Sequence, residues 1–256
     1  MIYNEDCLTW MQRQPAASVA TIISSPPYNR GIAYNHYQDR RRDYLDWQRA
    51  IWTQACRILQ PDGHLFINIA GSADKPFLPY QVAALVPWRV QNHIIWAKAV
   101  EFHGHIYGRS TVNIRAQYRL PNGHETVWHF TRQGRTPVDI GATAVGYRPE
   151  FAEDNFQRTG RRTRPTTTCW HIPYETTGAW GQSSASLKGQ NTHPAIFPRE
   201  LVRRLIRLAG GRGPVYDPFG GTGTTAVVAQ EMGVEWMTTE IDPDYCAFMQ
   251  ERTGAR

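Results

Sequence analysis

The chain has 256 residues, of which 41% are hydrophobic, enough for one substantial core and a smaller appended region. Its formal net charge of +6 suits a polyanionic partner, and its four scattered cysteines include no pair at zinc-ligand spacing. No uncharged apolar run reaches the ~18 residues of a membrane span, and the first residues lack a signal-peptide profile. These features exclude a membrane-spanning protein and a disulfide scaffold, and we expect a soluble cytoplasmic protein without a metal.

The first predicted elements are a buried strand and an amphipathic helix. Residues 19–23 are apolar or β-branched and predict a strand, which the prolines at 26 and 27 end. Residues 44–59 carry apolar side chains at spacings of three and four and predict a helix. Pro61-Asp62-Gly63 then predicts a turn before a strand at 64–69. Whatever follows the first strand therefore lies at its carboxyl edge.

The remaining pattern alternates strands and helices around one irregular region. Residues 93–97 and 125–130 are rich in aromatic and β-branched side chains and predict two further strands. From about Arg132 to Asn191 no long periodic segment is found, and such a stretch inside a compact protein is usually functional or disordered. Periodicity returns at Pro198, in a helix that Gly210-Gly211 ends. The alternation predicts an α/β sheet.

A glycine-rich segment lies between a predicted strand at 215–216 and a predicted helix at 226–233. A glycine turn in this position lets a ligand approach the backbone closely, and an acidic side chain at the end of the next strand, here Glu240, can hydrogen-bond a ribose. No lysine follows the glycines, which excludes a Walker A loop, and the spacing G-x-G-x-x-G is absent. A tight turn whose glycines serve only the backbone is the alternative.

The tetrapeptide Ser25-Pro26-Pro27-Tyr28 follows the first predicted strand. It suits recognition of a base amino group, whose lone pair is delocalised into the ring unless acceptors hold its N–H groups. The Ser25 hydroxyl and the Pro26 carbonyl are such acceptors, and the proline pair makes the backbone rigid. The Tyr28 ring could stack on a base that has been flipped out of a duplex. A strand-ending turn without chemistry is the alternative.

Together the two motifs resemble those of β-class S-adenosylmethionine-dependent DNA amino-methyltransferases, which act on cytosine N4 or adenine N6. The tetrapeptide is similar to their catalytic motif and precedes the cofactor loop, which is the order of the β class. Asp6-Cys7-Leu8 resembles the segment that approaches the adenine of the cofactor, and residues 191–201 resemble the segment before the cofactor loop. Residues 125–131 resemble a strand near the target pocket. The resemblance covers roughly three-quarters of the chain.

This resemblance implies an α/β, Rossmann-like methyltransferase fold with a seven-stranded, mostly parallel sheet and an irregular target-recognition insertion. Residues 1–131 are expected to form the catalytic half, 132–191 the target-recognition region and 192–256 the cofactor-binding half. The implied cofactor is S-adenosylmethionine. The candidate catalytic residues are Ser25, Pro26, Pro27 and Tyr28. The candidate cofactor-binding residues are Asp6, His193, Pro194, Asp217, Phe219, Gly220, Gly221, Thr222, Gly223, Thr224 and Glu240.

Two groups of arginines predict phosphate contacts with duplex DNA, because such contacts position a protein on its site. They are Arg30, Arg40, Arg41 and Arg42 after the tetrapeptide and Arg158, Arg161, Arg162 and Arg164 in the expected target-recognition region. The alternative is a solvated basic loop. A homodimer and a cognate restriction endonuclease are further partners that the resemblance allows.

The target base remains open between two amino groups. Serine at position 25 favours cytosine N4, since relatives that act on adenine more often carry aspartate there. Adenine N6 is the first alternative. A catalytically silent DNA-binding protein of the same fold is the second, and a methyltransferase that acts on RNA or on protein glutamine is the third.

Overall fold

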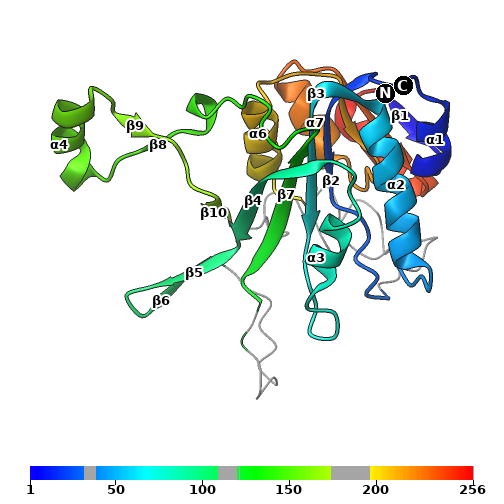
Figure 1. Cartoon of the computed structure of the whole chain (residues 1–256), viewed down its shortest axis with the longest axis horizontal. Helices are drawn as coiled ribbons and strands as arrows, with labels where there is room; N and C mark the ends of the chain where they lie inside the picture. Colours follow the sequence, from blue (N-terminus) through cyan, green and yellow to red (C-terminus); the bar gives the residue numbers. More distant parts are fainter. Residues whose placement is uncertain (32–38, 109–119, 121, 174–196, 256) are drawn as a thin grey trace.

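The computed structural model describes residues 1–31, 39–108, 120, 122–173 and 197–255. An eight-stranded sheet runs through the molecule in the order β1-β12-β11-β2-β3-β7-β4-β10 (Figure 1). Its strands are β1 (Ile2–Asn4), β2 (Val19–Ser24), β3 (Leu59–Ile69), β4 (Arg89–Ala97), β7 (His124–Thr131), β10 (Cys169–His171), β11 (Val215–Asp217) and β12 (Trp236–Glu240). Every pairing is parallel except the two made by β7.

The predicted α/β fold with a mostly parallel sheet is confirmed, with one strand more than expected. The additional strand is β10, which comes from the expected target-recognition region and pairs with β4 at the sheet edge. The helices are α1 (Cys7–Arg13), α2 (Tyr44–Ile58), α3 (Leu78–Ala83), α4 (Pro149–Thr159), α6 (Arg199–Leu208), α7 (Thr224–Glu231) and α8 (Pro243–Thr253).

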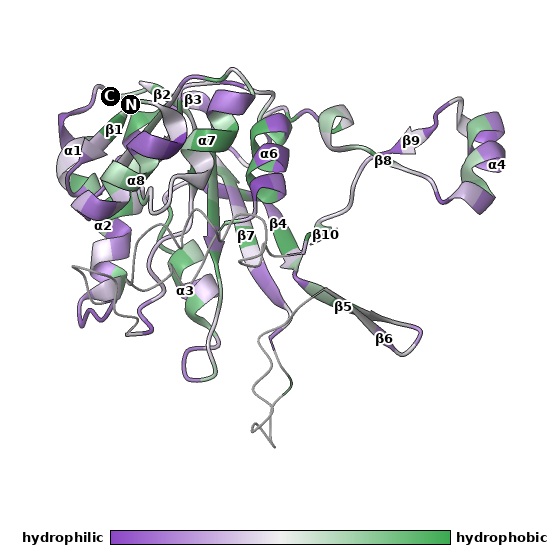
Figure 2. Ribbon diagram, turned by 180° about the vertical axis from the view of Figure 1, so that it is seen from behind, coloured by the Kyte–Doolittle hydropathy of each residue, from purple (hydrophilic) through white to green (hydrophobic). Residues whose placement is uncertain are grey.

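Helices cover both faces of the sheet because successive strand residues point to opposite sides. Ile22 belongs to the core beneath α1, α2 and α3, whereas its neighbour Ile23 belongs to the core beneath α6 and α7. The purple and green stripes of α6 in Figure 2 show its amphipathic character, and its apolar side contributes Leu201 and Leu205 to the second core. The helices that follow β2 and β11 therefore lie on opposite faces. In such doubly wound sheets, ligands bind beyond the carboxyl ends of the strands at this switch point.

The turn predicted at residues 61–63 lies within an irregular part of β3. Val19 of β2 is opposite Leu59, and Thr21 is opposite His64, so the residues between Leu59 and His64 bulge out of the ladder. Gly63 is needed at this bulge, since a Cβ there would come within 2.9 Å of the Ala20 carbonyl oxygen. The residues predicted to form a turn therefore form a bulge within one long strand.

The region from Arg132 to residue 173 is more regular than predicted; its continuation to Asn191 lies outside the described residues. It contains the 3-10 helix η1 (Gly141–Thr143), the strands β8 (Val145–Gly146) and β9 (Thr163–Arg164), and α4. Pro149 begins α4 and Gly160 ends it in the left-handed conformation, at φ 68°. The prediction missed α4, a short helix with few apolar residues, none of which is buried. Figure 1 shows α4, β8 and β9 projecting away from the sheet.

A second projection, the hairpin of β5 (Ala99–Phe102) and β6 (His105–Gly108), extends from the same side of the molecule (Figure 1). Among the described residues, no helix is long and apolar enough to cross a membrane. The same residues contain no group of three His, Cys, Asp or Glu side chains that could hold a metal ion.

Two histidines face each other in the buried centre of the sheet. His64 on β3 and His129 on β7 are 1% and 0% exposed, and Nδ1 of His64 lies 3.0 Å from Nε2 of His129. Nδ2 of Asn92 lies 2.9 Å from Nδ1 of His129. Two neutral rings fit this chain, with Asn92 donating to His129 and His129 donating to His64. Burial lowers the pKa of His64 to about 4 and that of His129 to about 3.

We expect the protein to lose stability as the pH falls below the ordinary histidine pKa of 6.5. The unfolded chain binds a proton on each ring from that pH downward, whereas the folded chain does so only near pH 4 and pH 3. The stabilisation is therefore complete above pH 6.5 and declines below it, by about 2 kcal/mol per ring between pH 7 and pH 5.

Urea unfolding at the two pH values measures this loss. A variant with both His64→Phe and His129→Phe keeps two aromatic rings but cannot bind the protons, so its free energy of unfolding should depend about 4 kcal/mol less on pH. Equal losses in the variant and in the wild type would contradict the assignment.

Candidate active site

The two sequence motifs meet because their strands are neighbours in the sheet. β2 and β11 run parallel, with Thr21 opposite Val215 and Ile22 opposite Tyr216. Parallel neighbours end at the same edge of a sheet, so Ser25, directly after β2, and Asp217, the last residue of β11, lie at that edge. This edge is the switch point described above. The structure therefore brings together segments that lie nearly 200 residues apart in the sequence.

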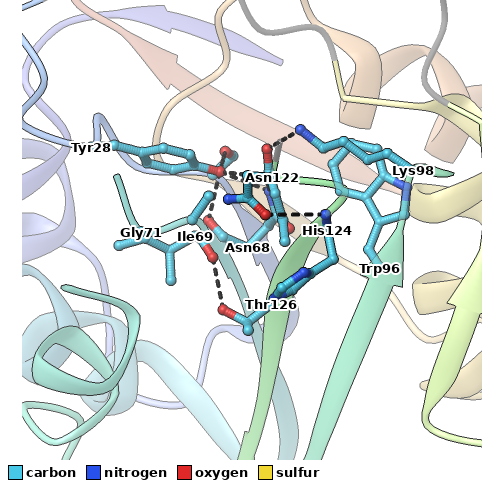
Figure 3. Close-up of polar contacts among 12 residues, drawn as sticks. Tyr28, Asn68, Ile69, Gly71, Trp96, Lys98, Asn122, His124 and Thr126 are labelled. Atoms are coloured by element: carbon cyan, nitrogen blue, oxygen red, sulfur yellow. Dashed lines mark hydrogen bonds and ion pairs between the residues drawn. The ribbon is translucent and has the colours of Figure 1, made fainter. Parts of the chain in front are cut away.

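The tetrapeptide after β2 is part of a partly buried hydrogen-bond network (Figure 3). Ser25 Oγ lies 3.1 Å from the Tyr28 hydroxyl, which donates to Oε2 of Glu125 over 2.9 Å. Nδ2 of Asn68 donates to the Tyr28 hydroxyl over 2.8 Å and to Oε2 of Glu125 over 2.6 Å. Lys98 forms an ion pair with the other oxygen, Oε1, of Glu125. Three strands, β3, β4 and β7, thus support the loop that follows β2.

The charges in this network set the direction of its hydrogen bonds. An ionised carboxylate only accepts, so the Tyr28 proton points to Glu125 and the Tyr28 oxygen is left to accept. Burial and the charge of Glu125 raise the pKa of Tyr28 well above its ordinary value, so its hydroxyl stays protonated. Ser25 therefore donates its proton to Tyr28, and the lone pairs of Ser25 Oγ remain for an incoming donor.

Three residues of this network were not predicted as site residues: Asn68, Lys98 and Glu125. Glu125 lies at the beginning of residues 125–131, which resemble a strand near the target pocket. This resemblance was the one feature of the sequence that pointed to Glu125. Asn68 and Lys98 lie at the ends of β3 and β4, and their approach to Tyr28 depends on strand order. The aromatic Trp96 also contributes, since the Lys98 ammonium lies 4.8 Å from its ring centroid.

The beginning of α2 connects the tetrapeptide to the cofactor loop. The hydroxyl of Tyr44, which is 3% exposed, donates to the carbonyl of Pro27 over 2.7 Å. One turn further, the Trp47 ring packs edge-on against Phe219, with centroids 5.7 Å apart. Tyr44 was predicted only as an apolar residue of the helix. Its hydroxyl in fact positions the backbone of the tetrapeptide.

The arginines that follow the tetrapeptide differ in their surroundings. Arg30 donates to the Gly71 carbonyl over 2.7 Å and lies 5.3 Å from the Tyr28 ring centroid. Arg41 is paired with Asp43 over 2.8 Å. Arg40 and Arg42 are exposed. Of the four predicted phosphate contacts, Arg30 and Arg41 therefore already make contacts within the protein, which the sequence did not indicate.

Hydrogen bonds join the residues directly after Tyr28 to the residues directly before α2. The carboxylate of Asp39, which is 1% exposed, accepts from the backbone N–H groups of Asn29 over 2.7 Å and Arg30 over 3.0 Å. Asn29 exchanges two hydrogen bonds with the backbone of Arg41. Residues 32–38 lie outside the described residues.

The glycine-rich loop after β11 is built around Asp217. Its carboxylate accepts from the Phe219 N–H over 3.0 Å and from the Thr225 hydroxyl over 2.7 Å, which joins the strand end to the first turn of α7. Burial raises the pKa of Asp217 to about 7, with a smaller contribution from the charge of Glu240. The neighbouring Thr222 and Thr224 are also buried.

Two of the loop glycines are required by packing within the chain. A Cβ on Gly220 would overlap Oγ1 of Thr238, and one on Gly223 would lie 2.5 Å from Cγ of Met249. Gly223 also has a φ of 79°. Glycine is therefore needed at both positions because side chains of α8 and β12 pack closely against the loop.

The acidic groups expected around the cofactor follow neighbouring strand ends. Glu240 ends β12, and its two carboxylate oxygens accept from the N–H groups of Gly221 over 2.7 Å and Asp242 over 2.9 Å. β1 pairs with β12, with Asn4 opposite Glu240, so Asp6 lies two residues beyond the end of β1 at the same edge of the sheet. Asp6 caps α1 by accepting from the Thr9 N–H over 2.9 Å. The predicted contacts His193 and Pro194 lie outside the described residues.

The second group of arginines lies on the projection that carries α4 and β9. Arg158, Arg161, Arg162 and Arg164 are all exposed. Arg158 donates to Asn155 over 2.7 Å, and the Arg162 guanidinium lies 4.3 Å from the Phe156 ring centroid. The structure gathers these arginines on one small unit at a distance from the tetrapeptide (Figure 1).

A doubly wound sheet with a glycine-rich loop and an acidic strand end, beside a serine aligned as an acceptor, defines a Rossmann-like methyltransferase. The sequence matches the N6/N4 type of DNA methylase over residues 19–251, and the chain belongs to this DNA methylase family. The predicted family and enzyme class are thereby confirmed.

Relatives of this family are similar along nearly the whole chain. The Type II methyltransferase M.BglII of Bacillus subtilis is 25% identical over 95% of this chain, which spans 66% of that protein, just under two thirds. The Type II methyltransferase M.PvuII of Proteus hauseri is 23% identical over 96% of this chain and 81% of that protein.

Two solved structures share the fold. The cytosine-N4-specific PvuII DNA methyltransferase is 22% identical, with a TM-score of 0.73 over 98% of this chain and 85% of that one. A putative DNA modification methylase of Thermus thermophilus, complexed with S-adenosyl-L-methionine, is 23% identical, with a TM-score of 0.61 over 99% of this chain and 92% of that one.

Proposed function

We propose that the protein transfers a methyl group from S-adenosylmethionine to the N4 amino group of a cytosine that is flipped out of duplex DNA. The observation that carries this proposal is the direction of the network behind Ser25, which leaves its Oγ as an acceptor beside the cofactor loop. Serine at this position favours cytosine over adenine, and one solved relative is cytosine-N4-specific.

The residues of the tetrapeptide have separate tasks in this reaction. Ser25 Oγ and the Pro26 carbonyl accept the two N–H groups of the target, which localises the nitrogen lone pair for attack. Tyr44 holds the adjoining Pro27 carbonyl and keeps this backbone in place. The Tyr28 ring, half-buried against the first core, offers a stacking platform that offsets part of the cost of base flipping.

The residues around the glycine loop fit S-adenosylmethionine, which when bound supplies an electrophilic methyl group on a sulfonium. The acidic side chains of Asp6, Asp217 and Glu240 suit a positively charged ligand. Glu240 uses two of the roughly four acceptor positions of a carboxylate within the protein, which leaves acceptors for ribose hydroxyls. A Glu240→Ala variant with unchanged affinity for S-adenosylmethionine would refute this ribose assignment.

The exposed arginines are proposed to contact the DNA backbone. Arg40 and Arg42 adjoin the tetrapeptide, and the four arginines near α4 belong to the proposed target-recognition region, 132–191. Residues 1–131 then form the catalytic half and residues 192–256 the cofactor-binding half. Phosphate contacts hold the protein in register without reading sequence, so the recognised sequence depends on other side chains.

The proposed function also has consequences for where the protein is found and for its partners. DNA as substrate implies a cytoplasmic protein, encoded by a bacterium, an archaeon or a phage. Because relatives are named Type II methyltransferases, a cognate restriction endonuclease is a proposed partner, as is a second copy of the chain.

The direct test is to incubate the protein with unmethylated genomic DNA and S-adenosylmethionine and to identify modified nucleosides by mass spectrometry. N4-methylcytosine is the expected product. N6-methyladenine would correct the target base and keep the enzyme class. DNA without a modified nucleoside, from protein that binds the cofactor, would overturn the proposal.

A further inference from the structure

We propose that Glu125 accepts the proton that the target amino group loses, through a relay formed by the hydroxyls of Ser25 and Tyr28. This inference rests on the proposed function, because methylation turns the amino nitrogen into a cation that must release a proton. It assigns a catalytic task to Glu125 and a relay task to the Tyr28 hydroxyl, in addition to the stacking task of the ring.

The geometry provides a continuous path for the proton. Ser25 Oγ lies 3.1 Å from the Tyr28 hydroxyl, and that hydroxyl lies 2.9 Å from Oε2 of Glu125. The competing acceptor for Tyr28, the Asn68 carbonyl, is farther away at 3.4 Å. Asn68 Nδ2 also donates to the Tyr28 oxygen, which keeps the tyrosine proton directed at Glu125 (Figure 3). Both hydroxyls are therefore aligned to pass protons in one direction.

The step balances in atoms and charge. The bond from the target nitrogen to the methyl carbon forms as the bond from that carbon to the sulfonium sulfur breaks, which moves the positive charge to nitrogen. The nitrogen then loses a proton to Ser25 Oγ, Ser25 passes its own proton to Tyr28, and Tyr28 passes its proton to Glu125. Glu125 ends as a neutral acid, both hydroxyls regain a proton, and the methylated amine is neutral.

Lys98 lies beside the carboxylate at the end of the relay. Its ammonium pairs with Oε1 of Glu125, the oxygen that the relay does not use, and leaves Oε2 to Tyr28. The side chains of Lys98 and Glu125 are 20% and 12% exposed, which gives the proton a route to solvent. Charged and titratable groups near this pair include Tyr28, Arg30 behind its ring, and His124, which precedes Glu125 on β7.

A purely structural role explains this cluster poorly. β7 is already held to β3 and β4 by backbone ladders, with Glu125 opposite Trp96. Ion pairs removed from water often stabilise a fold no more than apolar side chains of the same volume. Asn68 is 2% exposed, and its Oδ1 has no hydrogen-bond partner among the described residues, which is a further cost in stability. Such a cost suggests that the cluster serves the reaction.

The test compares single-turnover methyl transfer by wild type, Glu125→Gln and Tyr28→Phe, with cofactor and DNA bound beforehand. Each variant should slow transfer about 100-fold or more, the usual contribution of a positioned proton acceptor. The double variant should be no slower than the single ones, because both cut the same path. Glu125→Asp, which keeps a carboxylate, should restore part of the rate that Glu125→Gln loses.

A matched variant separates the relay from folding. Thr126→Val removes a buried hydrogen bond, 2.7 Å long, from the neighbouring residue of β7 to the Ile69 carbonyl, and should leave the rate unchanged. If Glu125→Gln fails to fold, Tyr28→Phe still carries the test.

The outcomes distinguish this inference from the proposed function. An active wild type whose Glu125→Gln and Tyr28→Phe variants stay within threefold of it would overturn the relay alone. A wild type that methylates neither cytosine nor adenine would overturn the proposed function.

Discussion

Replacing Ser25 by alanine is expected to slow methyl transfer by at least about 100-fold and to leave the binding of S-adenosylmethionine nearly unchanged. The substitution removes the oxygen proposed to accept an amino N–H and also the first hydroxyl of the path to Glu125. It leaves the glycine loop untouched, since the described contacts of that loop are made by β12, α2 and α8. Single-turnover rates with radiolabelled cofactor measure the first effect, and calorimetric titration measures the second.

Ser24 provides a matched control one residue away. It is 1% exposed, and its hydroxyl has no hydrogen-bond partner among the described residues. Ser24→Ala therefore makes the same chemical change in the same strand end, and its rate should stay within about twofold of wild type. Equal losses in both variants would show that the strand end, and not the Ser25 hydroxyl, governs the reaction.

Replacing Gly223 by alanine is expected to destabilise the fold by about 3 kcal/mol or more and to abolish cofactor binding in the remaining folded protein. Two penalties combine at this position. A φ of 79° is unfavourable for any residue with a Cβ, and the new Cβ would lie 2.5 Å from Cγ of Met249. Relief of this overlap must shift α8 or the loop itself. Denaturant unfolding gives the free energy, and titration with S-adenosylmethionine gives the affinity.

The matching substitution at Gly233 separates the backbone penalty from the steric penalty. It has a φ of 68°, yet a Cβ there would meet nothing within 4 Å. Gly233→Ala should therefore destabilise by only the backbone part, about 1 kcal/mol, and leave cofactor affinity intact. If the two variants lose the same stability, the close approach of Met249 is not what requires a glycine at 223.

Residue type and spacing were enough to predict much of the fold and both motifs. The helix at 44–59 and the strands at 64–69, 93–97 and 125–130 carry strong periodic patterns, because each buries an apolar face, and they match α2, β3, β4 and β7. Gly220, Gly223 and Glu240 could be recognised since a tight turn and a strand-end carboxylate need particular residue types. The same reasoning failed for α4, which buries no residue and has few apolar side chains to reveal it.

By itself, then, the sequence determined which segments form elements, which residues begin the two motifs and which enzyme family they imply. Tertiary structure alone decided which side chains meet. Asn68, Lys98 and Glu125 converge on Tyr28 because β3, β7 and β4 are neighbours in the sheet, and Tyr44 reaches Pro27 because α2 packs against β3, the strand beside β2. The order of the strands depends on the burial of two cores to which distant parts of the chain contribute, so no local pattern encodes it. The contacts that align Ser25 can therefore be seen only in the folded sheet.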